Sequence, residues 1–377
     1  MLPLSLYIHT PWCVQKCPYC DFNSHKSPNT LPESSYIQAL IADLEEDVRH
    51  FPNHRLIQSI FIGGGTPSLL SAEAYETLFT ALKKHLIFAP HIEITLEANP
   101  GTVEQQRFKD YLAIGINRLS LGIQSFNPIH LKKLGRIHND KEAHKAIECA
   151  RNAGFNNINL DLMHGLPEQS VQEGLNDLRA ALAHEPEHLS WYQLTLEPNT
   201  IFYKNPPKLP SEEKVHQLET TGFDLLQKQG FERYEISAFC RHQKYAQHNL
   251  NYWLFGDYYG IGAGAHGKLS KLDDQSITRT RKYRQPHDYL NIEKPYLAEQ
   301  TTLSTKDRRF EFMLNTTRLT QPITLDLWTE RTGLEPSELT PYLEQAKARQ
   351  LIEDAPNGWM VTELGRRFSN DLQAIFL

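Results

Sequence analysis

The chain has 377 residues, of which 40% are hydrophobic, 10% aromatic and 22% charged. This composition is typical of a globular protein with a large core and excludes a disordered chain, and the length predicts two domains. Lys and Arg number 39 against 45 Asp and Glu, a net charge of −6. Non-specific binding to nucleic acid needs an excess of positive charge, so nucleic acid is not expected as a partner.

No apolar stretch approaches the ~18 residues of a membrane span. The first five residues, Met1 to Ser5, also lack the basic and then apolar order of a signal peptide. We therefore expect a cytoplasmic protein without membrane insertion.

Short apolar runs alternate with longer amphipathic stretches from the N-terminus to about residue 240. This alternation is typical of βα units repeated around a parallel sheet. The predicted strands are 4–8, 59–62, 92–97, 118–122, 157–162 and 188–194, and the predicted helices lie near 34–50, 72–86, 103–113, 140–153 and 171–184. The expected fold of residues 1–240 is a partial (β/α)6 barrel, in the α/β class.

The remainder of the chain has a different pattern. A proline-rich stretch, 205–210, precedes a predicted helix over 211–229, and an irregular, aromatic-rich region over 241–300 is expected to cap the barrel. Residues 301–377 read as three helices, two short strands (351–354 and 359–362) around an Asn357-Gly358 turn, and a last helix, which resembles a winged helix. This segment holds nine Lys and Arg against eleven Asp and Glu, which favours a packing module over a DNA-reading wing.

Three of the five cysteines form a C-x3-C-x2-C motif, Cys13, Cys17 and Cys20, just after the first predicted strand. In a reducing compartment such a cluster favours metal binding over disulfides. Three thiolates on one loop can hold three irons of a [4Fe-4S] cluster and leave the fourth iron open. A zinc site completed by His25 is the alternative. Cys149 and Cys240 lie far along the chain, and we expect both to be buried in packing.

Polar residues follow the other predicted strands, where a βα barrel carries its functional groups. A glycine loop, Gly63-Gly64-Gly65-Thr66-Pro67, follows the second strand and would let a ligand approach the backbone, although a tight βα turn would also explain it. The polar residues at or beyond the other strand ends are Glu97, Gln124, Arg136, Asp161 and Thr195. Acids accept hydrogen bonds from hydroxyls and amines, and arginine binds carboxylates, so this set suits a nucleoside with charged groups.

The cysteine spacing, with an aromatic residue between the last two cysteines, resembles the radical S-adenosylmethionine (SAM) superfamily. Further segments occur in the order of its oxygen-independent coproporphyrinogen III oxidase-like family, above all Cys20-Asp21-Phe22, Asp161 to Pro167 and His248 to Trp253. The resemblance is greatest to the haem-chaperone branch of that family. It implies a [4Fe-4S] cluster, SAM and haem as cofactors, with these SAM contacts by position: Tyr7, Gly64, Gly65, Thr66, Glu97, Gln124, Arg136, Asp161, Thr195 and His266.

Two departures separate this chain from the true oxidases. Phe22 stands where they carry a further cysteine, and only twelve residues precede Cys13, whereas they have a longer leader. The resemblance therefore favours a haem chaperone that transfers haem to acceptor proteins. The alternatives are a radical SAM enzyme acting on a tetrapyrrole, with a ferredoxin or flavodoxin as electron donor, and an interaction protein stabilised by zinc.

His248 opens the segment His248-Asn249-Leu250-Asn251-Tyr252-Trp253 and is a candidate haem ligand, because a neutral imidazole binds iron and the two aromatic rings offer a flat apolar surface. His9 is a second candidate. A hydrogen-bonded histidine beside a core aromatic pair is the competing explanation. The sequence leaves open the haem ligand, the acceptor, SAM cleavage, the oligomeric state and the role of the C-terminal domain.

Overall fold

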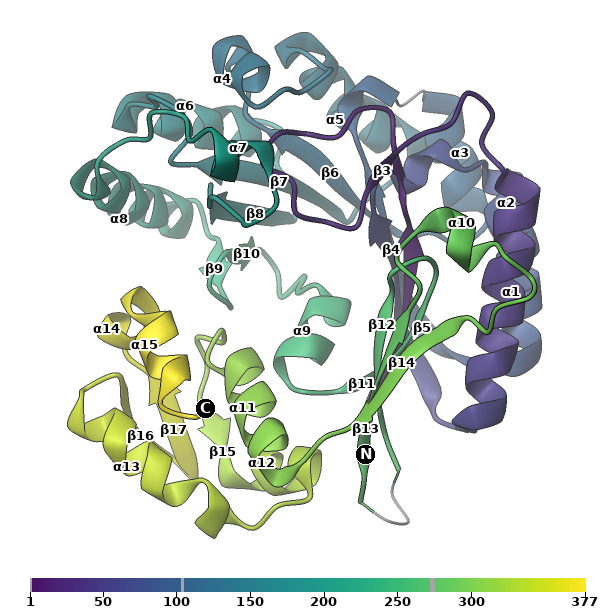
Figure 1. The fold of residues 1–377 in the computed structure, drawn as a ribbon. Coiled ribbons are helices and arrows are strands. Elements are labelled where there is room, and N and C mark those ends of the chain that lie inside the picture. Colours follow the sequence, from purple (N-terminus) through teal and green to yellow (C-terminus); the bar gives the residue numbers. More distant parts are fainter. Residues whose placement is uncertain (1, 103–104, 272–274) are drawn as a thin grey trace.

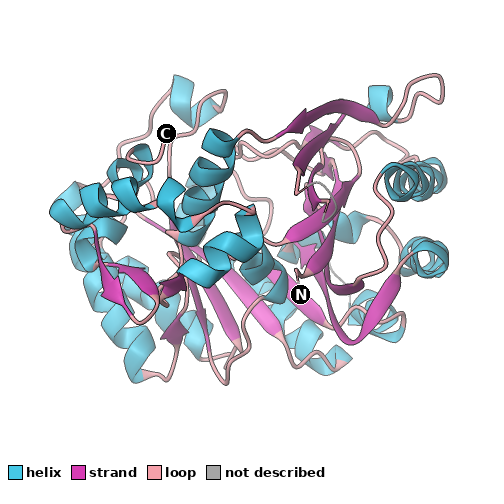
Figure 2. Cartoon of the chain, turned by 90° about the horizontal axis from the view of Figure 1, so that it is seen from below, coloured by secondary structure: helices cyan, strands magenta, loops and turns pink. Residues whose placement is uncertain are grey.

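The computed structural model describes residues 2–102, 105–271 and 275–377 of the chain. A twelve-stranded sheet dominates it, in the order β14-β13-β12-β11-β1-β4-β5-β6-β7-β8-β10-β9. Its strands are β1 (Leu4–Thr10), β4 (Leu56–Gly64), β5 (Ile87–Ala98), β6 (Arg118–Gln124), β7 (Ile158–His164), β8 (His188–Gln193), β9 (Glu232–Arg233), β10 (Ala238–Cys240), β11 (Asp257–Ile261), β12 (His266–Ser270), β13 (Ile277–Lys282) and β14 (Leu297–Thr302). Figure 2 shows these strands side by side across the molecule.

The six strands predicted for the barrel pair in parallel and in chain order, from β1 through β4, β5, β6 and β7 to β8. The predicted partial barrel is therefore confirmed. Two strands are longer than expected, because β4 begins at Leu56 and β5 at Ile87. Pro90 lies within β5, although a proline normally marks the end of a strand. The pairing of β5 with β4 continues past it, with a shift in register between Ile57 and Ser59 of β4.

Helices cover the outside of the curved sheet (Figure 1). The helices of this part of the chain are α1 (Glu33–His50), α2 (Ala72–His85), α3 (Gln105–Ala113), α4 (Pro128–Lys133), α5 (Asp140–Ala153), α6 (Val171–Leu182), α7 (Ile201–Lys204) and α8 (Glu212–Lys228), with short 3-10 turns at Pro67–Leu69 and Pro100–Thr102. The short α7 lies beside the cysteine loop instead of outside the sheet, since Phe202 N donates to Pro18 O at 3.0 Å. The first two residues of the predicted helix over 103–113 lie outside the described residues. The sequence analysis did not predict α4 and α7, which are too short to show a periodic pattern.

Local signals set the ends of these helices. Asn139 before α5 and Ser170 before α6 each form a capping box with the glutamate three residues on, which satisfies backbone N–H groups at the helix start. Gly154 ends α5 at a φ of 106°, a conformation that side-chain-bearing residues avoid. The helix positions predicted from periodicity are thus explained by specific caps.

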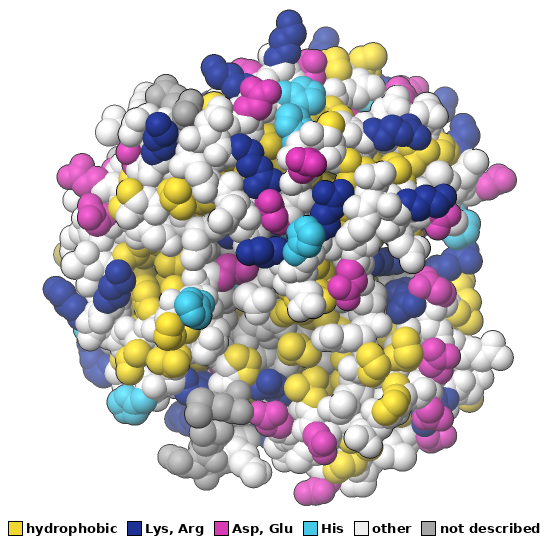
Figure 3. All heavy atoms as spheres, turned by 180° about the vertical axis from the view of Figure 1, so that it is seen from behind, with side chains coloured by type: hydrophobic (Ala, Val, Ile, Leu, Met, Phe, Trp, Pro, Cys, Tyr) yellow, Lys and Arg dark blue, Asp and Glu magenta, His cyan; other side chains and the backbone are white. Residues whose placement is uncertain are grey.

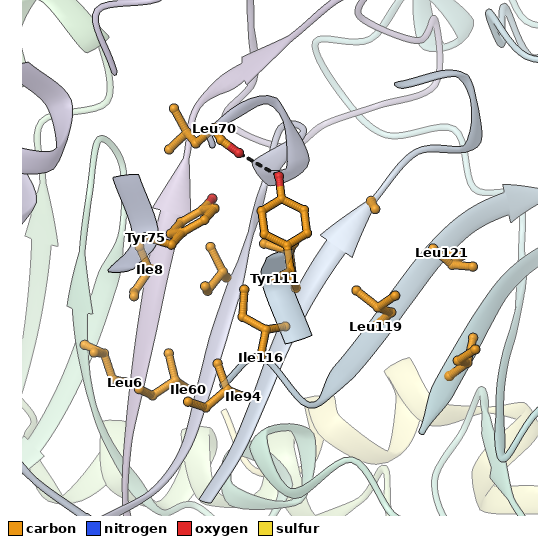
Figure 4. Packing of buried hydrophobic residues seen from close by; sticks show 14 of the residues in the cluster. Leu6, Ile8, Ile60, Leu70, Tyr75, Ile94, Tyr111, Ile116, Leu119 and Leu121 are labelled. Atoms are coloured by element: carbon orange, nitrogen blue, oxygen red, sulfur yellow. Dashed lines mark hydrogen bonds between the residues drawn. The ribbon is translucent and has the colours of Figure 1, made fainter. Parts of the chain in front are cut away.

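The main core lies between the sheet and these helices. Alternate residues of each strand point outward into it, such as Leu6 and Ile8 of β1 and Ile60 of β4, all fully buried. Figure 4 shows them packed with Tyr75 of α2 and with Tyr111 of α3, whose hydroxyl donates to the Leu70 carbonyl at 2.6 Å. The other face of the same strands is consequently left to line the inside of the barrel.

The expectation that residues 241–300 are irregular is wrong. They contain α9 (Gln247–Trp253), α10 (Pro286–Tyr289) and the strands β11 to β14. β11 pairs in parallel with β1, and β12, β13 and β14 then extend the sheet by antiparallel pairing. The sequence pattern concealed them because β13, Ile277–Lys282, is rich in charged and threonine side chains rather than apolar ones.

The C-terminal segment has the expected winged-helix-like content. It contains α11 (Thr305–Thr316), β15 (Ile323–Thr324), α12 (Leu325–Thr332), a 3-10 turn (Pro336–Glu338), α13 (Thr340–Ala348), β16 (Ile352–Ala355) and β17 (Gly358–Val361). The hairpin turns at Asn357, which has a φ of 58°. The single last helix predicted from the sequence is instead two, α14 (Glu363–Arg367) and α15 (Ser369–Ala374), and a second hydrophobic core lies beneath these elements.

Among the described residues, no helix combines the length and the apolar character that a membrane crossing requires. The face in Figure 3 carries Lys and Arg side chains interspersed with Asp and Glu. Cys149 and Cys240 are buried in hydrophobic clusters, as predicted.

Candidate cofactor site

The cysteine loop is held at the carboxyl end of β1 by backbone pairing. Two short strands, β2 (Trp12–Cys13) and β3 (His25–Lys26), pair in parallel, so both ends of the loop meet. His25 N donates to Pro11 O at 2.7 Å and Ser27 N to Cys13 O at 2.8 Å. The three motif cysteines are free thiols of intermediate burial on this closed loop. Burial raises the pKa of the Cys13 and Cys20 thiols above the ordinary value.

The glycine loop lies directly against the cysteine loop. Gly65 N donates to Thr10 O and Thr66 N to Trp12 O, both at 2.7 Å. A Cβ on Gly65 would lie 2.5 Å from Trp12 O, and a Cβ on Gly64, whose φ is 113°, would lie 2.5 Å from the His9 ring. Only glycine fits this approach, so the loop is more than an ordinary βα turn.

Two carboxyl groups project into the barrel from β5 and β7, the strands on either side of β6. Glu97 of β5 accepts from Gly64 N at 3.1 Å, and burial together with the nearby Asp161 charge raises its pKa to about 8. Asp161 of β7 accepts from Ser120 Oγ at 3.0 Å and Asn159 Nδ2 at 2.8 Å, and burial raises its pKa as well. Glu97 is therefore largely protonated at neutral pH and can donate a hydrogen bond as well as accept one.

Arg136 connects the cysteine loop to the strand ends. Its Nη2 donates to Asn99 Oδ1 at 2.5 Å and to Gly122 O at 2.7 Å, and its Nη1 lies 3.6 Å from Cys17 Sγ. These contacts hold the guanidinium beside the thiols. A carboxylate bound next to the cysteine loop would meet a positive charge there.

One cavity of about 490 Å³ brings most of the predicted site together, within the range of small-molecule sites. Its walls include all three motif cysteines. They also include eight of the residues predicted as SAM contacts: Gly64, Gly65, Thr66, Glu97, Gln124, Arg136, Asp161 and Thr195.

Two predicted SAM contacts do not line this cavity. Tyr7 lies inside the barrel, where its hydroxyl is 2.8 Å from His9 Nδ1 and its ring stacks on Phe61. His266 is exposed at the start of β12. The prediction for these two residues rests on the resemblance alone.

The candidate haem ligands are buried and hydrogen-bonded. His248 has 1% of its surface exposed, with Nδ1 3.0 Å from Ser59 Oγ and Nε2 2.8 Å from Tyr252 Oη. His9 Nε2 lies 2.9 Å from Asn23 O, and its Nδ1 is the partner of Tyr7. Burial lowers the pKa of His248 to about 3 and of His9 to about 4, so both rings are neutral. In this structure neither ring has a nitrogen free for iron.

The cavity also contains residues that the sequence analysis did not select. Tyr192 of β8 donates to Gln124 Oε1 at 2.8 Å, and Gln124 has a φ of 69°, a strained value for a residue other than glycine. The inward alternation along β8 could have identified Tyr192. Arg318 comes from the C-terminal domain, and no local pattern marks it.

The residues present fit a cluster better than a single metal ion. Across the described ranges, no group of three His, Cys, Asp or Glu side chains converges as ligands of one ion. A tetrahedral zinc site needs its donors around one point, whereas a [4Fe-4S] cluster takes one thiolate for each of three irons. His25, the fourth ligand of the zinc alternative, has its Nε2 3.3 Å from Asn23 Oδ1.

Two family models match the chain: the radical SAM superfamily over residues 7–181 and the HemN C-terminal domain over residues 303–368. The chain is 48% identical to the protein named heme chaperone HemW of Haemophilus influenzae over 378 residues, covering 100% of this chain and 98% of that protein. It is also 48% identical to the Escherichia coli protein of the same name, with the same coverage. A mouse protein, radical S-adenosyl methionine domain-containing protein 1, mitochondrial, is 36% identical over 70% of this chain and 60% of its own length.

The fold is similar to that of a solved structure, the coproporphyrinogen III oxidase HemN from Escherichia coli. The TM-score is 0.82 at 21% identity, and the match covers 100% of this chain and 90% of the oxidase. The likeness confirms the barrel and its C-terminal extension.

Proposed function

Because the chain belongs to the radical SAM superfamily and, within it, to the family of proteins named heme chaperone HemW, we propose that it binds a [4Fe-4S] cluster, SAM and haem and transfers haem to acceptor proteins. The observation that carries this proposal is the single cavity that joins the three motif cysteines to eight predicted SAM contacts.

Cys13, Cys17 and Cys20 would hold the cluster, each thiolate on one iron. A cluster bound in this way supplies an open iron to which the amino and carboxylate groups of SAM can bind, as the superfamily resemblance implies. The chain's own contribution is the closed loop, which fixes the three sulfur atoms on one wall of the cavity. Arg136, 3.6 Å from Cys17 Sγ, would orient a carboxylate at that wall.

The rest of the SAM molecule would lie along the strand ends. Gly64, Gly65 and Thr66 line the cavity and would contact the methionine part. Their N–H groups already bond to Glu97, Thr10 and Trp12, and the two glycines let this loop pack against the cysteine loop. Glu97 and Asp161 are buried acids that can bind the amine or the ribose hydroxyls. Tyr7 and His266 are proposed as SAM contacts only because their positions match those of contact residues in the family.

Haem would use the same cavity, which has apolar as well as polar walls. Tyr19, Phe22 and Met163 line it, and Phe22 has 61% of its surface exposed. An exposed phenylalanine at a cavity wall suits contact with a flat apolar macrocycle. The proposal therefore does not depend on His248 as a ligand.

The test is an oxygen-free reconstitution with ferrous iron and sulfide, followed by iron, sulfide and zinc analysis and then by SAM and haem titrations. We expect four irons per chain, SAM binding and haem binding in the wild-type protein. Cys17→Ala should lose the cluster and SAM binding. Cys149→Ala is the matched control, because Cys149 is buried in α5 and does not line the cavity. Zinc without iron would refute the cluster, and a cluster-loaded protein that binds no haem would refute the chaperone.

The same preparation separates a chaperone from an enzyme. The haem-loaded protein is mixed with a haem-free acceptor such as apo-cytochrome. If haem is transferred, the visible spectrum should change to that of the haem-bound acceptor. Anaerobic turnover of coproporphyrinogen with SAM and a reductant would instead support the enzyme alternative. A carrier predicts transfer without tetrapyrrole conversion.

A further inference from the structure

The C-terminal domain contributes a charged side chain to the cofactor cavity. Arg318 lies in the turn after α11, more than 100 residues beyond the last barrel strand, yet it lines the same cavity as the motif cysteines. Its side chain is 31% exposed. The barrel alone therefore does not complete the walls of this cavity.

Arg318 is held in position on two sides. Its guanidinium carbon lies 4.3 Å from the centroid of the Trp253 ring, and its Nη2 lies 3.3 Å from Glu235 Oε2. The backbone next to it is also fixed, since Leu319 bridges to Glu235 and Thr320 N donates to Tyr234 O at 3.2 Å. The guanidinium is thus oriented before any ligand binds.

Arg318 also has hydrogen-bond donors to spare. Glu235 pairs with Arg318 through Oε2 alone, because its Oε1 accepts hydrogen bonds from the N–H and the hydroxyl of Ser237. Arg318 Nε is buried and has no hydrogen-bond partner among the described residues. Arg136, the other arginine of the cavity wall, also has a buried Nε without a partner among the described residues, but its Nη2 donates to both Asn99 and Gly122 and its Nη1 contacts Cys17. Of these two arginines, Arg318 has more N–H groups left for a ligand.

We propose that Arg318 binds a carboxylate of the tetrapyrrole held in this cavity, so that the C-terminal domain recognises the anionic edge of the macrocycle. This rests on the proposed haem function of the same cavity. A guanidinium binds a carboxylate through two parallel hydrogen bonds, and stacking on Trp253 leaves its edge available for them. Apart from Arg136, which lies beside the cysteine loop, the titratable side chains of this wall include the acids Asp21, Glu97, Asp161 and Glu197, so a second cation favours an anionic ligand here.

This assignment also explains the aromatic end of the His248 to Trp253 segment. Trp253 supports Arg318 at the cavity, while His248 at the other end of α9 anchors the helix inside the barrel through Ser59. The His248 to Trp253 segment therefore does not contact the ligand itself but holds Arg318 in position.

The experiment compares haem with haem dimethyl ester, whose carboxylates are masked, on the full chain with its cluster reconstituted. Binding is followed by visible absorption and tryptophan fluorescence in the same dilute detergent. The wild type should bind haem about tenfold tighter than the ester, because the ester cannot form the charged pair with Arg318. Arg318→Met should lose this preference, with its haem affinity falling to that of the ester, and Arg318→Lys should keep part of it.

Arg349→Met is the matched control, an exposed arginine of the same domain, and should behave as the wild type. Glu235→Gln should keep the preference, because Arg318 then retains its support on Trp253 and loses a competing anion. Circular dichroism and cluster absorption establish that each variant is folded.

An unchanged preference for haem in folded Arg318→Met would overturn the assignment while leaving the haem function intact. Loss of SAM binding in this variant with haem binding unchanged would also overturn it, because Arg318 would then serve the other ligand. A wild-type protein that binds neither porphyrin would refute the proposed function itself.

Discussion

Single residues of the barrel strands carry features that are typical of ligand sites. Gln124 has a backbone φ of 69° at the end of β6, and its side chain is fixed by Tyr192. Glu97 and Asp161 are buried acids whose pKa values burial raises. Such strain and desolvation destabilise a fold and concentrate at functional sites.

Gly64 provides a test of the close approach between the two loops. Gly64→Ala should lower stability by about 1–3 kcal/mol for the backbone strain, and more for the contact with His9, whose ring is held on both nitrogens. It should also weaken SAM binding about tenfold or more. Urea unfolding and SAM titration measure the two effects.

Gly115→Ala is the matched control. Gly115 has a similar φ of 105°, but a Cβ there would meet nothing within 4 Å. The stability of this variant should fall only by the amount due to backbone strain, and it should bind SAM as the wild type does. Equal behaviour of the two variants would mean that the approach to His9 is unimportant.

Asp177 of α6 provides a test by pH. It accepts from Ser125 Oγ and Phe126 N, both at 2.7 Å, and so fixes the segment that follows Gln124. Burial raises its pKa from 3.8 to about 6, so the folded protein holds this proton more tightly than the unfolded chain does. Stability from this group is therefore highest below pH 4 and falls by roughly 2–3 kcal/mol as the pH rises to about 6.

Asp177→Asn removes the titration. The stability difference between the wild type and this variant, measured by urea unfolding, should change between pH 4 and pH 6 and stay constant above pH 7. A difference independent of pH over the whole range would show that the carboxyl is not perturbed.

At the scale of elements, buried charges join parts of the sheet that lie far apart in sequence. Lys282 of β13 lies 2.5 Å from Asp43 and 2.6 Å from Asp47 of α1, and all three side chains are almost fully buried. Asp43 also accepts from Gly262 N in the turn after β11. The added strands are thereby attached to the first barrel helix.

Lys282→Met should cost about 3–5 kcal/mol at pH 8, because two buried carboxylates lose their cation. Burial raises the pKa of both acids, for Asp47 to about 7, so protonation at lower pH should recover part of this loss. Lys306→Met, at an exposed position, serves as control in the same unfolding experiment and should change stability by less than about 0.5 kcal/mol. A similarly small loss of stability in both variants would contradict the stabilising role of Lys282 between Asp43 and Asp47.

In the whole molecule, α9 connects the inside of the barrel to the hydrophobic core of the C-terminal domain. Figure 1 shows α9 between the sheet and the C-terminal helices. Its His248 end is bonded to β4, and Leu250, Trp253 and Leu254 pack on the C-terminal core. The cavity includes residues from both sides, so its shape depends on this junction.

Phe255, directly after α9, is 1% exposed in the C-terminal core and packs edge-on against Phe312. Phe255→Ala should cost about 3–5 kcal/mol, and the C-terminal domain should then unfold before the barrel as a separate calorimetric transition. Phe368→Ala, at a 47% exposed position, should keep the wild-type profile. One unchanged transition in the Phe255 variant would indicate that the two cores are not coupled through this residue.

The order of the six barrel strands, the cysteine motif and the glycine loop could all be predicted from the amino-acid sequence. These depend on short-range regularities, namely the period of apolar residues, helix caps and fixed spacings along a loop. The positions of Glu97 and Gln124 near strand ends followed in the same way, because parallel strands bring their carboxyl ends to one edge of the barrel. Asp161, expected near the end of its strand, lies in the middle of β7 because that strand continues to His164.

Which residues share the cavity depends on contacts between distant parts of the chain, and these could not be predicted from the sequence. His248 belongs to a segment that reads as a ligand motif, but folding buries it between Ser59 and Tyr252. Arg318 carries no local signal, yet the pairing of Leu319 with Glu235 brings it to the cavity wall. β11 lies beside β1 for the same reason: contacts between residues more than 200 positions apart are set by complementary packing of the folded surfaces, which no short window of sequence contains.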